Sequence, residues 1–219
     1  MKKVLTSFLL VCGLFFSGHC LAQPFAEEIE QFKKQDQLHP PPANAILFVG
    51  SSSFRKWTDV SSYFPGFIIV NRGFGGSTLP DVIRYAGDII IPYHPKQVVI
   101  YCGDNDLASS DAITADSVFK RFRVLFELIR SGLPGENIVF VSIKPSPSRA
   151  RLKEKVEKAN QLIQNYLSLN RNTGFVDVYH NMFNSDGSLM TDIFLEDSLH
   201  MNAKGYAIWQ KAIAPYLSK

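Results

Sequence analysis

The sequence predicts an α/β fold in which helices cover both faces of a parallel sheet. Five short runs of residues are apolar at consecutive positions rather than at alternate ones, which is typical of strands buried on both faces. Segments with helical spacing of apolar residues fill the gaps between these runs. Strands that alternate with helices imply crossover connections, and these join parallel strands. We therefore expect one sheet of five parallel strands inside an α/β/α sandwich.

Each predicted strand is a continuous apolar stretch that ends near a glycine or a group of polar residues. Glycine and small polar residues favour the turns that follow strands. The five strands are expected at Ala45–Val49, Phe67–Val70, Gln97–Cys102, Asn137–Ile143 and Gly174–Val178.

The predicted helices have one apolar face and one polar face. A short helix from Phe25 to Gln37 should stop before Pro40, because proline restricts its own backbone and that of the preceding residue. Three longer helices are expected at Ser117–Ser131, Ala150–Leu169 and Ala203–Leu217.

Length and composition limit the kind of protein this can be. The 219 residues suit one α/β domain, and 46% hydrophobic content is sufficient for a sizeable core, which excludes disorder for most of the chain. The formal net charge is only +3 and basic residues are not clustered. Binding to nucleic acid through phosphate contacts is therefore not expected.

The first 22 residues have the pattern of a secretory signal peptide. Lys2 and Lys3 precede an apolar run, Val4–Phe16, which is shorter than the ~20 residues of a membrane span. Small residues lead up to a cleavage site after Ala22; a lipoprotein signal cleaved before Cys20 is the alternative. We expect an exported protein, periplasmic or extracellular, with a single domain over residues 23–219 and no stable membrane insertion after cleavage. Its one remaining cysteine could form no internal disulfide.

Four polar blocks follow predicted strands or lie near the C-terminus. They are Gly50–Phe54, Asn71–Ser77, Gly103–Asp106 and Asp197–His200. Ligands of open parallel sheets bind outside the carboxyl ends of the strands. Each block alone is commonly structural, as a helix cap or a turn.

Together, the four blocks contain the groups that an acyl transfer requires. Ser52 would be the nucleophile, His200 its base, and Asp197 the acid that orients the base. The backbone amides of Ser52 and Gly76 and the side-chain amide of Asn105 would stabilise the oxyanion. Glycine suits this role because it lets a substrate approach the backbone closely.

In this order the blocks resemble those of the SGNH, or GDSL-type, hydrolases, especially their platelet-activating-factor acetylhydrolase-like branch. The resemblance extends from Ile46 to Trp209 and includes Asn202, Gly205 and Tyr206 after the Asp-x-x-His block. It implies a flavodoxin-like three-layer fold with five parallel strands, a catalytic domain over most of the mature chain, and ester hydrolysis without a metal or another cofactor.

The chain departs from the family pattern at one position. The aspartate that usually precedes the nucleophile is Ser51 here. Three consecutive serines also leave Ser51 and Ser53 as alternatives to Ser52, although both would more naturally cap the helix or lie in the core.

Two other functions remain open from the sequence. A metal-dependent phosphoesterase would gather Asp104, Asp106, Asp197, His180 and His200 around a cation, although no His-x-His or Asp-x-His pair is present. An exported glycan-binding module on a hydrolase fold is the non-enzymatic alternative.

The substrate is expected to be a small-molecule, glycan or lipid ester met outside the cytoplasm. No insertion that could form a lid interrupts the blocks, which favours short acyl groups such as acetyl. Lys144 and Arg149 follow the fourth predicted strand and are candidates to contact a leaving group, with Phe74 as a possible wall of the site.

Overall fold

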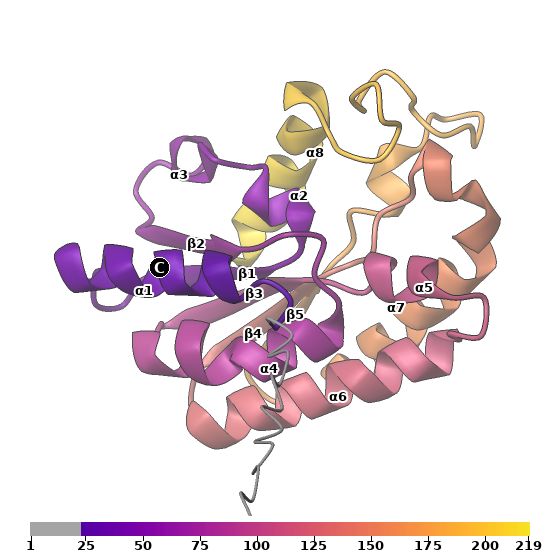
Figure 1. Cartoon of the computed structure of the whole chain (residues 1–219). Coiled ribbons are helices and arrows are strands. Elements are labelled where there is room, and N and C mark those ends of the chain that lie inside the picture. The colour runs from indigo at the N-terminus through magenta and orange to yellow at the C-terminus, as the bar shows by residue number, and fades with distance from the viewer. Residues whose placement is uncertain (1–22) are drawn as a thin grey trace, which may run out of the picture.

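The computed structural model describes residues 23–219 and confirms the α/β/α sandwich (Figure 1). Its central sheet has five parallel strands in the order β2-β1-β3-β4-β5. The strands are β1 (Ile46–Gly50), β2 (Ile69–Gly73), β3 (Gln97–Tyr101), β4 (Asn137–Val141) and β5 (Thr173–Val176). The predicted signal peptide, residues 1–22, lies outside the described residues.

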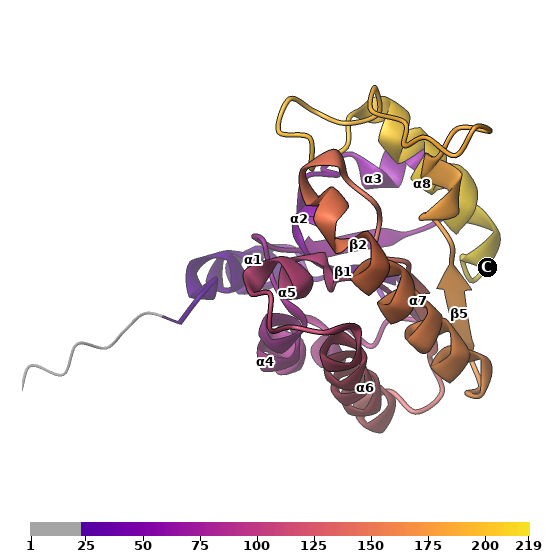
Figure 2. The same cartoon turned by 90° about the vertical axis from the view of Figure 1, so that its right-hand side faces the viewer.

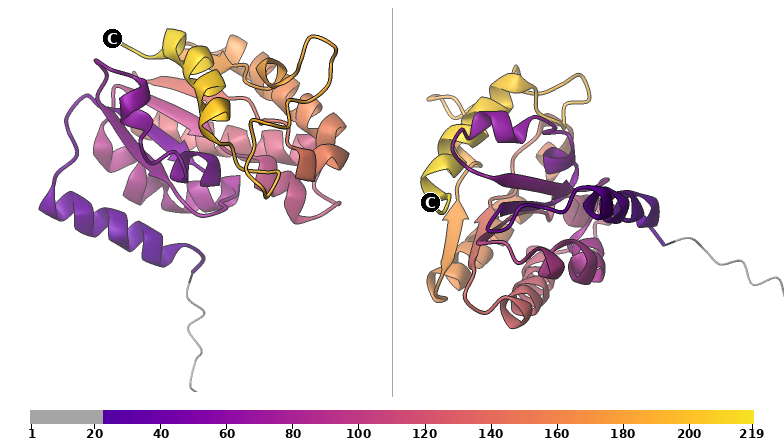
Figure 3. Two further views of the ribbon diagram at one scale, coloured as in Figure 1. Left: turned by 90° about the horizontal axis from the view of Figure 1, so that it is seen from above. Right: turned by 90° about the vertical axis from the view of Figure 1, so that its left-hand side faces the viewer.

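Helices cover the sheet on both faces. Figure 1 shows α4 and α6 below the sheet and α2, α3 and α8 above it, and Figure 3 (left) shows α8 lying across the sheet in yellow. On the lower face and its flanks are α1 (Ala26–Leu38), α4 (Leu79–Ile89), α6 (Ala115–Gly132) and α7 (Lys153–Ser168). The upper face carries α2 (Ser52–Arg55), α3 (Val60–Tyr63) and α8 (Ala203–Ile213). The remaining elements are α5 (Asp104–Ser109) and the 3₁₀ helices η1 (Ile91–Tyr93), η2 (Pro147–Leu152), η3 (His180–Met182) and η4 (Ala214–Tyr216).

The two faces of β1 explain why this strand is apolar throughout. Leu47 and Val49 belong to the core beneath the sheet, and Ile46 and Phe48 belong to the core above it. All four are fully buried. A parallel strand that is covered on both faces has no position for a polar side chain. The continuous apolar run therefore predicted this strand.

The second strand lies later than the sequence analysis expected. It was predicted at Phe67–Val70 and is observed at Ile69–Gly73. The strand is at the edge of the sheet, where polar residues are tolerated. Asn71 and Arg72 extend it, and Arg72 pairs with Asp36 of α1.

Several helix boundaries also differ from the predictions. Helices α4 and α5 were not assigned from the sequence. The third predicted helix divides at Lys153 into η2 and α7, and the last α-helix ends at Ile213 because Pro215 cannot continue it. Within residues 23–219, no helix is both long enough and apolar enough to cross a membrane.

Because all five strands run in the same direction, their carboxyl ends meet along one edge of the sheet. Helices α2 and α5 begin just beyond β1 and β3. Figure 2 looks onto the side of the sandwich on which α5 lies. The polar blocks at the strand ends are therefore brought together.

Candidate active site

The three residues expected to form a catalytic triad meet in a chain of hydrogen bonds. Ser52 Oγ lies 2.9 Å from His200 Nε2, and His200 Nδ1 lies 2.6 Å from Asp197 Oδ2. Ser52 is partly buried, and the side chain of His200 is 15% exposed. The sequence separates Ser52 and His200 by 148 residues, and the fold places them in direct contact.

The position of Ser52 depends on the glycine at the end of β1. Gly50 has a φ of 139°, and a Cβ there would lie 1.9 Å from the carbonyl oxygen of Tyr101 on β3. No other residue fits this close approach. The Ser51 amide donates to the same carbonyl, and the chain then turns into α2 with Ser52 as its first residue. The N–H of a first helical residue has no partner inside the helix, so it remains free to contact a ligand.

Two side chains from other elements fix α2 in place. Asn71 on β2 donates through Nδ2 to the carbonyl oxygens of Phe54 and Trp57, at 2.7 and 3.2 Å. Tyr206 on α8 donates to the carbonyl oxygen of Ser53 at 2.9 Å. The helix that carries Ser52 is thus anchored to both the sheet and the C-terminal helix.

Asp197 and His200 lie in a tight loop that Asp197 itself organises. Asp197 Oδ1 accepts the backbone N–H groups of Leu199 and His200 at 3.0 and 2.9 Å. Desolvation alone would raise the pKa of Asp197, but the bond from the His200 side chain and these backbone bonds hold that pKa well below its usual value. The ionised carboxylate accepts a hydrogen bond from the N–H at Nδ1, which leaves Nε2 as the acceptor that faces Ser52.

The two further oxyanion candidates lie on neighbouring loops. A Cβ added to Gly76 would lie 3.8 Å from Asn105 Nδ2. The loop of Gly76 is joined to the end of β1, because the Phe74 amide and the Ser77 hydroxyl both bond the carbonyl oxygen of Gly50, at 3.0 and 3.1 Å. The structure therefore places both candidates near the strand end that leads to Ser52.

The side-chain amide of Asn105 is held at both ends. Its Nδ2 donates to the carbonyl oxygen of Ser77 at 3.1 Å, and its Oδ1 accepts from Nη2 of Arg149 at 2.8 Å. An amide nitrogen carries two hydrogens, so one N–H remains available beside Gly76.

Asp106 holds the end of the loop that carries Gly76, a role that the sequence analysis did not assign. Its carboxylate is fully buried and accepts the backbone N–H of Leu79, the first residue of α4, at 2.9 Å and Arg121 at 2.7 Å. Burial raises the pKa of Asp106, and the bonds from Arg121 and Leu79 oppose that shift. No sequence signal distinguished this structural aspartate from a catalytic one.

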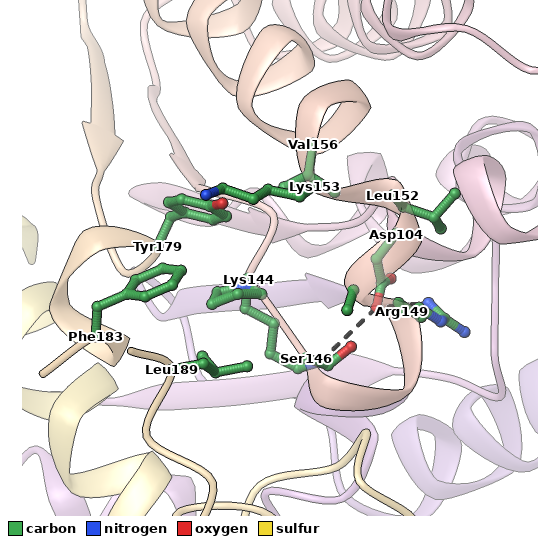
Figure 4. Close-up of a pocket in the computed structure, with 12 residues that line it drawn as sticks. Asp104, Lys144, Ser146, Arg149, Leu152, Lys153, Val156, Tyr179, Phe183 and Leu189 are labelled. Atoms are coloured by element: carbon green, nitrogen blue, oxygen red, sulfur yellow. Dashed lines mark ion pairs between the residues drawn. The ribbon is translucent and has the colours of Figure 1, made fainter. Parts of the chain in front are cut away.

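Three charged residues that lie next to Asn105, namely Asp104, Lys144 and Arg149, form a cluster, and Figure 4 shows these three side chains. Asp104 Oδ2 is 2.9 Å from Arg149 and 3.9 Å from the Lys144 ammonium nitrogen, which has no hydrogen-bond partner among residues 23–219. Burial lowers the pKa of Lys144 to about 8, against an opposing effect of Asp104. The cluster borders a cavity of about 180 Å³ whose other walls are mostly apolar; they include Leu152, Val156, Tyr179, Phe183 and Leu189.

The three residues suggested to contact substrate have different surroundings. Arg149 is partly accessible, with 19% of its side chain exposed. Lys144 is buried inside the ion cluster. Phe74 is fully buried and contacts the rings of Phe25 and Tyr85, so it belongs to the core rather than to an exposed wall. An aromatic residue in a glycine-rich loop could be assigned to either environment from sequence alone.

The two neighbouring serines do not share the contacts of Ser52. Both Ser51 and Ser53 are buried. Ser51 precedes α2, but its side chain does not cap the helix, and its hydroxyl has no hydrogen-bond partner within residues 23–219.

The residues of the alternative metal site are not assembled. Asp104 pairs with Arg149, Asp106 with Arg121, and Asp197 with His200. His180 pairs with Asp177 in a separate, exposed contact. Within the described part of the chain, no three His, Cys, Asp or Glu side chains lie together as a cation site requires.

Comparison with known proteins finds relatives in sequence and in structure. Over 171 residues the chain is 28% identical to platelet-activating factor acetylhydrolase IB subunit alpha2 of Homo sapiens, covering 74% of this chain and 71% of the relative. A GDSL-like lipase from Bacteroides thetaiotaomicron superposes with a TM-score of 0.71 at 22% identity, covering 86% of this chain and 96% of that one. A mutant of an acetyl-xylooligosaccharide esterase from Geobacillus gives a TM-score of 0.63 at 14% identity over 80% and 94% of the two chains.

The two structural likenesses show a shared fold. The model of the GDSL-like Lipase/Acylhydrolase family matches residues 48–208, which include every residue of the site described above. The chain therefore belongs to the GDSL-like lipase/acylhydrolase family.

Proposed function

We propose that the protein is a serine esterase that hydrolyses carboxylic esters of short acyl groups. The observation that carries the proposal is the chain of hydrogen bonds from Ser52 through His200 to Asp197, at 2.9 and 2.6 Å. A serine hydroxyl in contact with a histidine, whose far nitrogen contacts a carboxylate, is the arrangement that activates serine as a nucleophile.

In the proposed reaction, Ser52 Oγ attacks the ester carbonyl carbon while His200 Nε2 takes the hydroxyl proton. The negative charge that forms on the carbonyl oxygen is stabilised by the N–H groups of Ser52, Gly76 and Asn105 Nδ2. The protonated His200, stabilised by Asp197, then gives its proton to the departing alkoxide. Water, deprotonated by His200, releases the acid from the acyl-serine and restores the hydroxyl.

The names of two relatives support a short acyl group. The relatives whose names state an acyl group act on acetyl esters, one of platelet-activating factor and one of xylooligosaccharides. For this protein we propose an acetyl ester of a glycan or a lipid.

We also propose that the protein acts outside the cytoplasm, because its first 22 residues have the composition of a signal peptide. Expression of the full chain in a bacterium, followed by N-terminal sequencing of the exported protein, tests this. A start at Gln23 is expected. A lipid-modified Cys20 or retention of Met1 in the cytoplasm would contradict it.

The catalytic proposal is tested with p-nitrophenyl esters of increasing acyl length. We expect kcat/KM to be highest for acetate or propionate, and Ser52→Ala to lower it by about 10³-fold or more. Ser61→Ala, an exposed serine in α3, is the matched control and should retain wild-type activity. An organophosphonate should label the wild type at Ser52.

The outcomes separate the alternatives. A folded protein without esterase activity or phosphonate labelling, but with affinity for oligosaccharides, would indicate the glycan-binding module. Activity that EDTA abolishes and a divalent metal restores would indicate the phosphoesterase. Activity retained in Ser52→Ala and lost in Ser51→Ala or Ser53→Ala would move the nucleophile.

A further inference from the structure

The catalytic usefulness of Asn105 depends on which way its amide faces. Rotation by 180° about the last side-chain bond exchanges Oδ1 and Nδ2 and would replace an oxyanion donor with an acceptor. Two contacts oppose that rotation: Ser77 presents a carbonyl oxygen to Nδ2, and Arg149 presents an N–H to Oδ1. A flipped amide would place oxygen against oxygen and N–H against N–H.

Arg149 is the stronger of these two contacts. Its 2.8 Å bond to Asn105 Oδ1 comes from a charged donor, and such bonds are about twice as strong as neutral ones. The guanidinium also draws electron density toward Oδ1, which makes the N–H groups of Nδ2 better donors.

Arg149 is itself held in place by the residue next to Asn105. Its Nη1 lies 2.9 Å from Asp104 Oδ2, while Asp104 Oδ1 accepts the backbone N–H of Asn105 at 2.9 Å. The guanidinium, the carboxylate and the Asn105 amide therefore form a closed ring of contacts. Figure 4 shows Asp104 between Arg149 and Lys144 in this cluster.

The segment that carries Arg149 is also attached to the loop of the triad. Ser148 donates its backbone N–H and its hydroxyl to the carbonyl oxygen of Ser198, at 3.1 and 2.9 Å. Ser198 lies between Asp197 and His200. The residue before Arg149 is thus attached to the loop that carries Asp197 and His200, and this attachment helps to hold Arg149 against Asn105.

We propose that Arg149 is a positioning residue that holds Asn105 Nδ2 toward the oxyanion and strengthens it as a donor. This rests on the proposed esterase function and adds a residue that acts only through Asn105. A group that improves an oxyanion donor acts in the transition state, so its loss should lower kcat and leave KM nearly unchanged.

The test is a double-mutant cycle between Arg149→Met and Asn105→Ala, with p-nitrophenyl acetate as substrate. Arg149→Met alone should lower kcat by about 10-fold, less than the 10²- to 10³-fold of a lost donor, with KM within about 2-fold. In the Asn105→Ala background the same change should alter kcat by less than about 2-fold, because the residue through which it acts is absent.

A matched control and a second readout separate positioning from general damage. Arg151→Met removes an exposed arginine of the same η2 segment and should leave kcat unchanged. Within residues 23–219, Arg151 forms an ion pair only with the exposed Asp111. The rate of phosphonate inactivation, which also places an oxygen in the oxyanion hole, should fall in parallel with kcat in Arg149→Met.

Several results would overturn the proposal. If Arg149→Met raises KM with kcat unchanged, the residue binds substrate directly. If the two substitutions multiply in the cycle, Arg149 acts independently of Asn105. If Arg149→Met does not fold, Arg149→Lys provides the test, since lysine lacks the two separate terminal nitrogens with which Arg149 contacts Asp104 and Asn105. A wild-type kcat in that variant would refute the role. A folded wild type that hydrolyses no ester would instead contradict the proposed function itself, whatever the effect of Arg149→Met.

Discussion

The buried ammonium group of Lys144 should make the stability of this protein depend on pH in a way that one substitution removes. The side chain is fully buried, and its ammonium nitrogen makes no hydrogen bond within residues 23–219. The nearest carboxylate oxygen, on Asp104, is 3.9 Å away and is shared with Arg149 at 2.9 Å. Burial therefore outweighs attraction, and the pKa of Lys144 falls from 10.5 to about 8.

The size of the effect follows from the difference between these two values. A fall of about 2.5 in pKa corresponds to about 3 kcal/mol. Below pH 8 the lysine is protonated in both the folded and the unfolded chain, and the folded state bears the full cost. As pH rises from 8 toward 10.5, the folded chain loses its proton before the unfolded chain does, so the cost disappears and stability increases.

Lys144→Met tests this, because methionine fills similar space without the charge and leaves Asp104 paired with Arg149. In denaturant titrations at pH 7 and pH 10, we expect the free energy of unfolding of the wild type, relative to the variant, to rise by about 2–3 kcal/mol. Lys153→Met is the control, since that lysine is 63% exposed, and it should follow the wild-type curve. Parallel pH curves for wild type and Lys144→Met would refute the reasoning.

Three further outcomes follow from the contacts at the site. Ser51→Ala should change kcat by less than about 3-fold and should not lower the free energy of unfolding, because the buried Ser51 hydroxyl has no partner to lose; a calorimetric melt and an esterase assay check this. Asp197→Asn should lower kcat by about 10²- to 10⁴-fold while the Ser52 and His200 side chains stay in place, because the imidazole loses the carboxylate that fixes its tautomer; a wild-type kcat would remove Asp197 from the triad. Asp106→Asn should cost about 1–3 kcal/mol in unfolding free energy, because the partly exposed Arg121 loses its charged partner; an unchanged free energy of unfolding would show that the carboxylate is not a structural anchor.

The sheet could be predicted from the sequence because burial on both faces leaves an unmistakable pattern. β1, β3 and β4 are apolar at nearly every position. The pattern failed where a strand has one neighbour only, since an edge strand can include Asn71 and Arg72. Helix α4 was not recognised, although Thr78 and Asp81 form a capping box at its start and proline follows at Pro80.

The candidate site could be predicted because three of its four polar blocks follow strands and the fourth has the Asp-x-x-His pattern, and the structure brings Ser52, His200 and Asp197 into contact. The supporting residues were not found, because they act through long-range contacts that no local pattern records. Asp106 reaches the start of α4 across 27 residues, and Ser148 reaches Ser198 across 50. Arg149 was noted only as a possible substrate contact, since nothing in the sequence shows that it faces Asn105.

The stability cost of Lys144 and the contacts of Arg149 lead to one further expectation. A buried charge without a hydrogen bond lowers the stability of the fold, and destabilising features of this kind are concentrated at functional sites. With Lys144 present, Asp104 is attracted by two cations; without it, Arg149 is the only one, and the guanidinium should move toward Asp104 and away from Asn105. Lys144→Met should therefore be more stable than the wild type at pH 7 and yet have a kcat lower by about 3- to 10-fold, with the loss absent in the Asn105→Ala background. A variant that gains stability with an unchanged kcat would show that Lys144 is no part of the arrangement that holds Asn105.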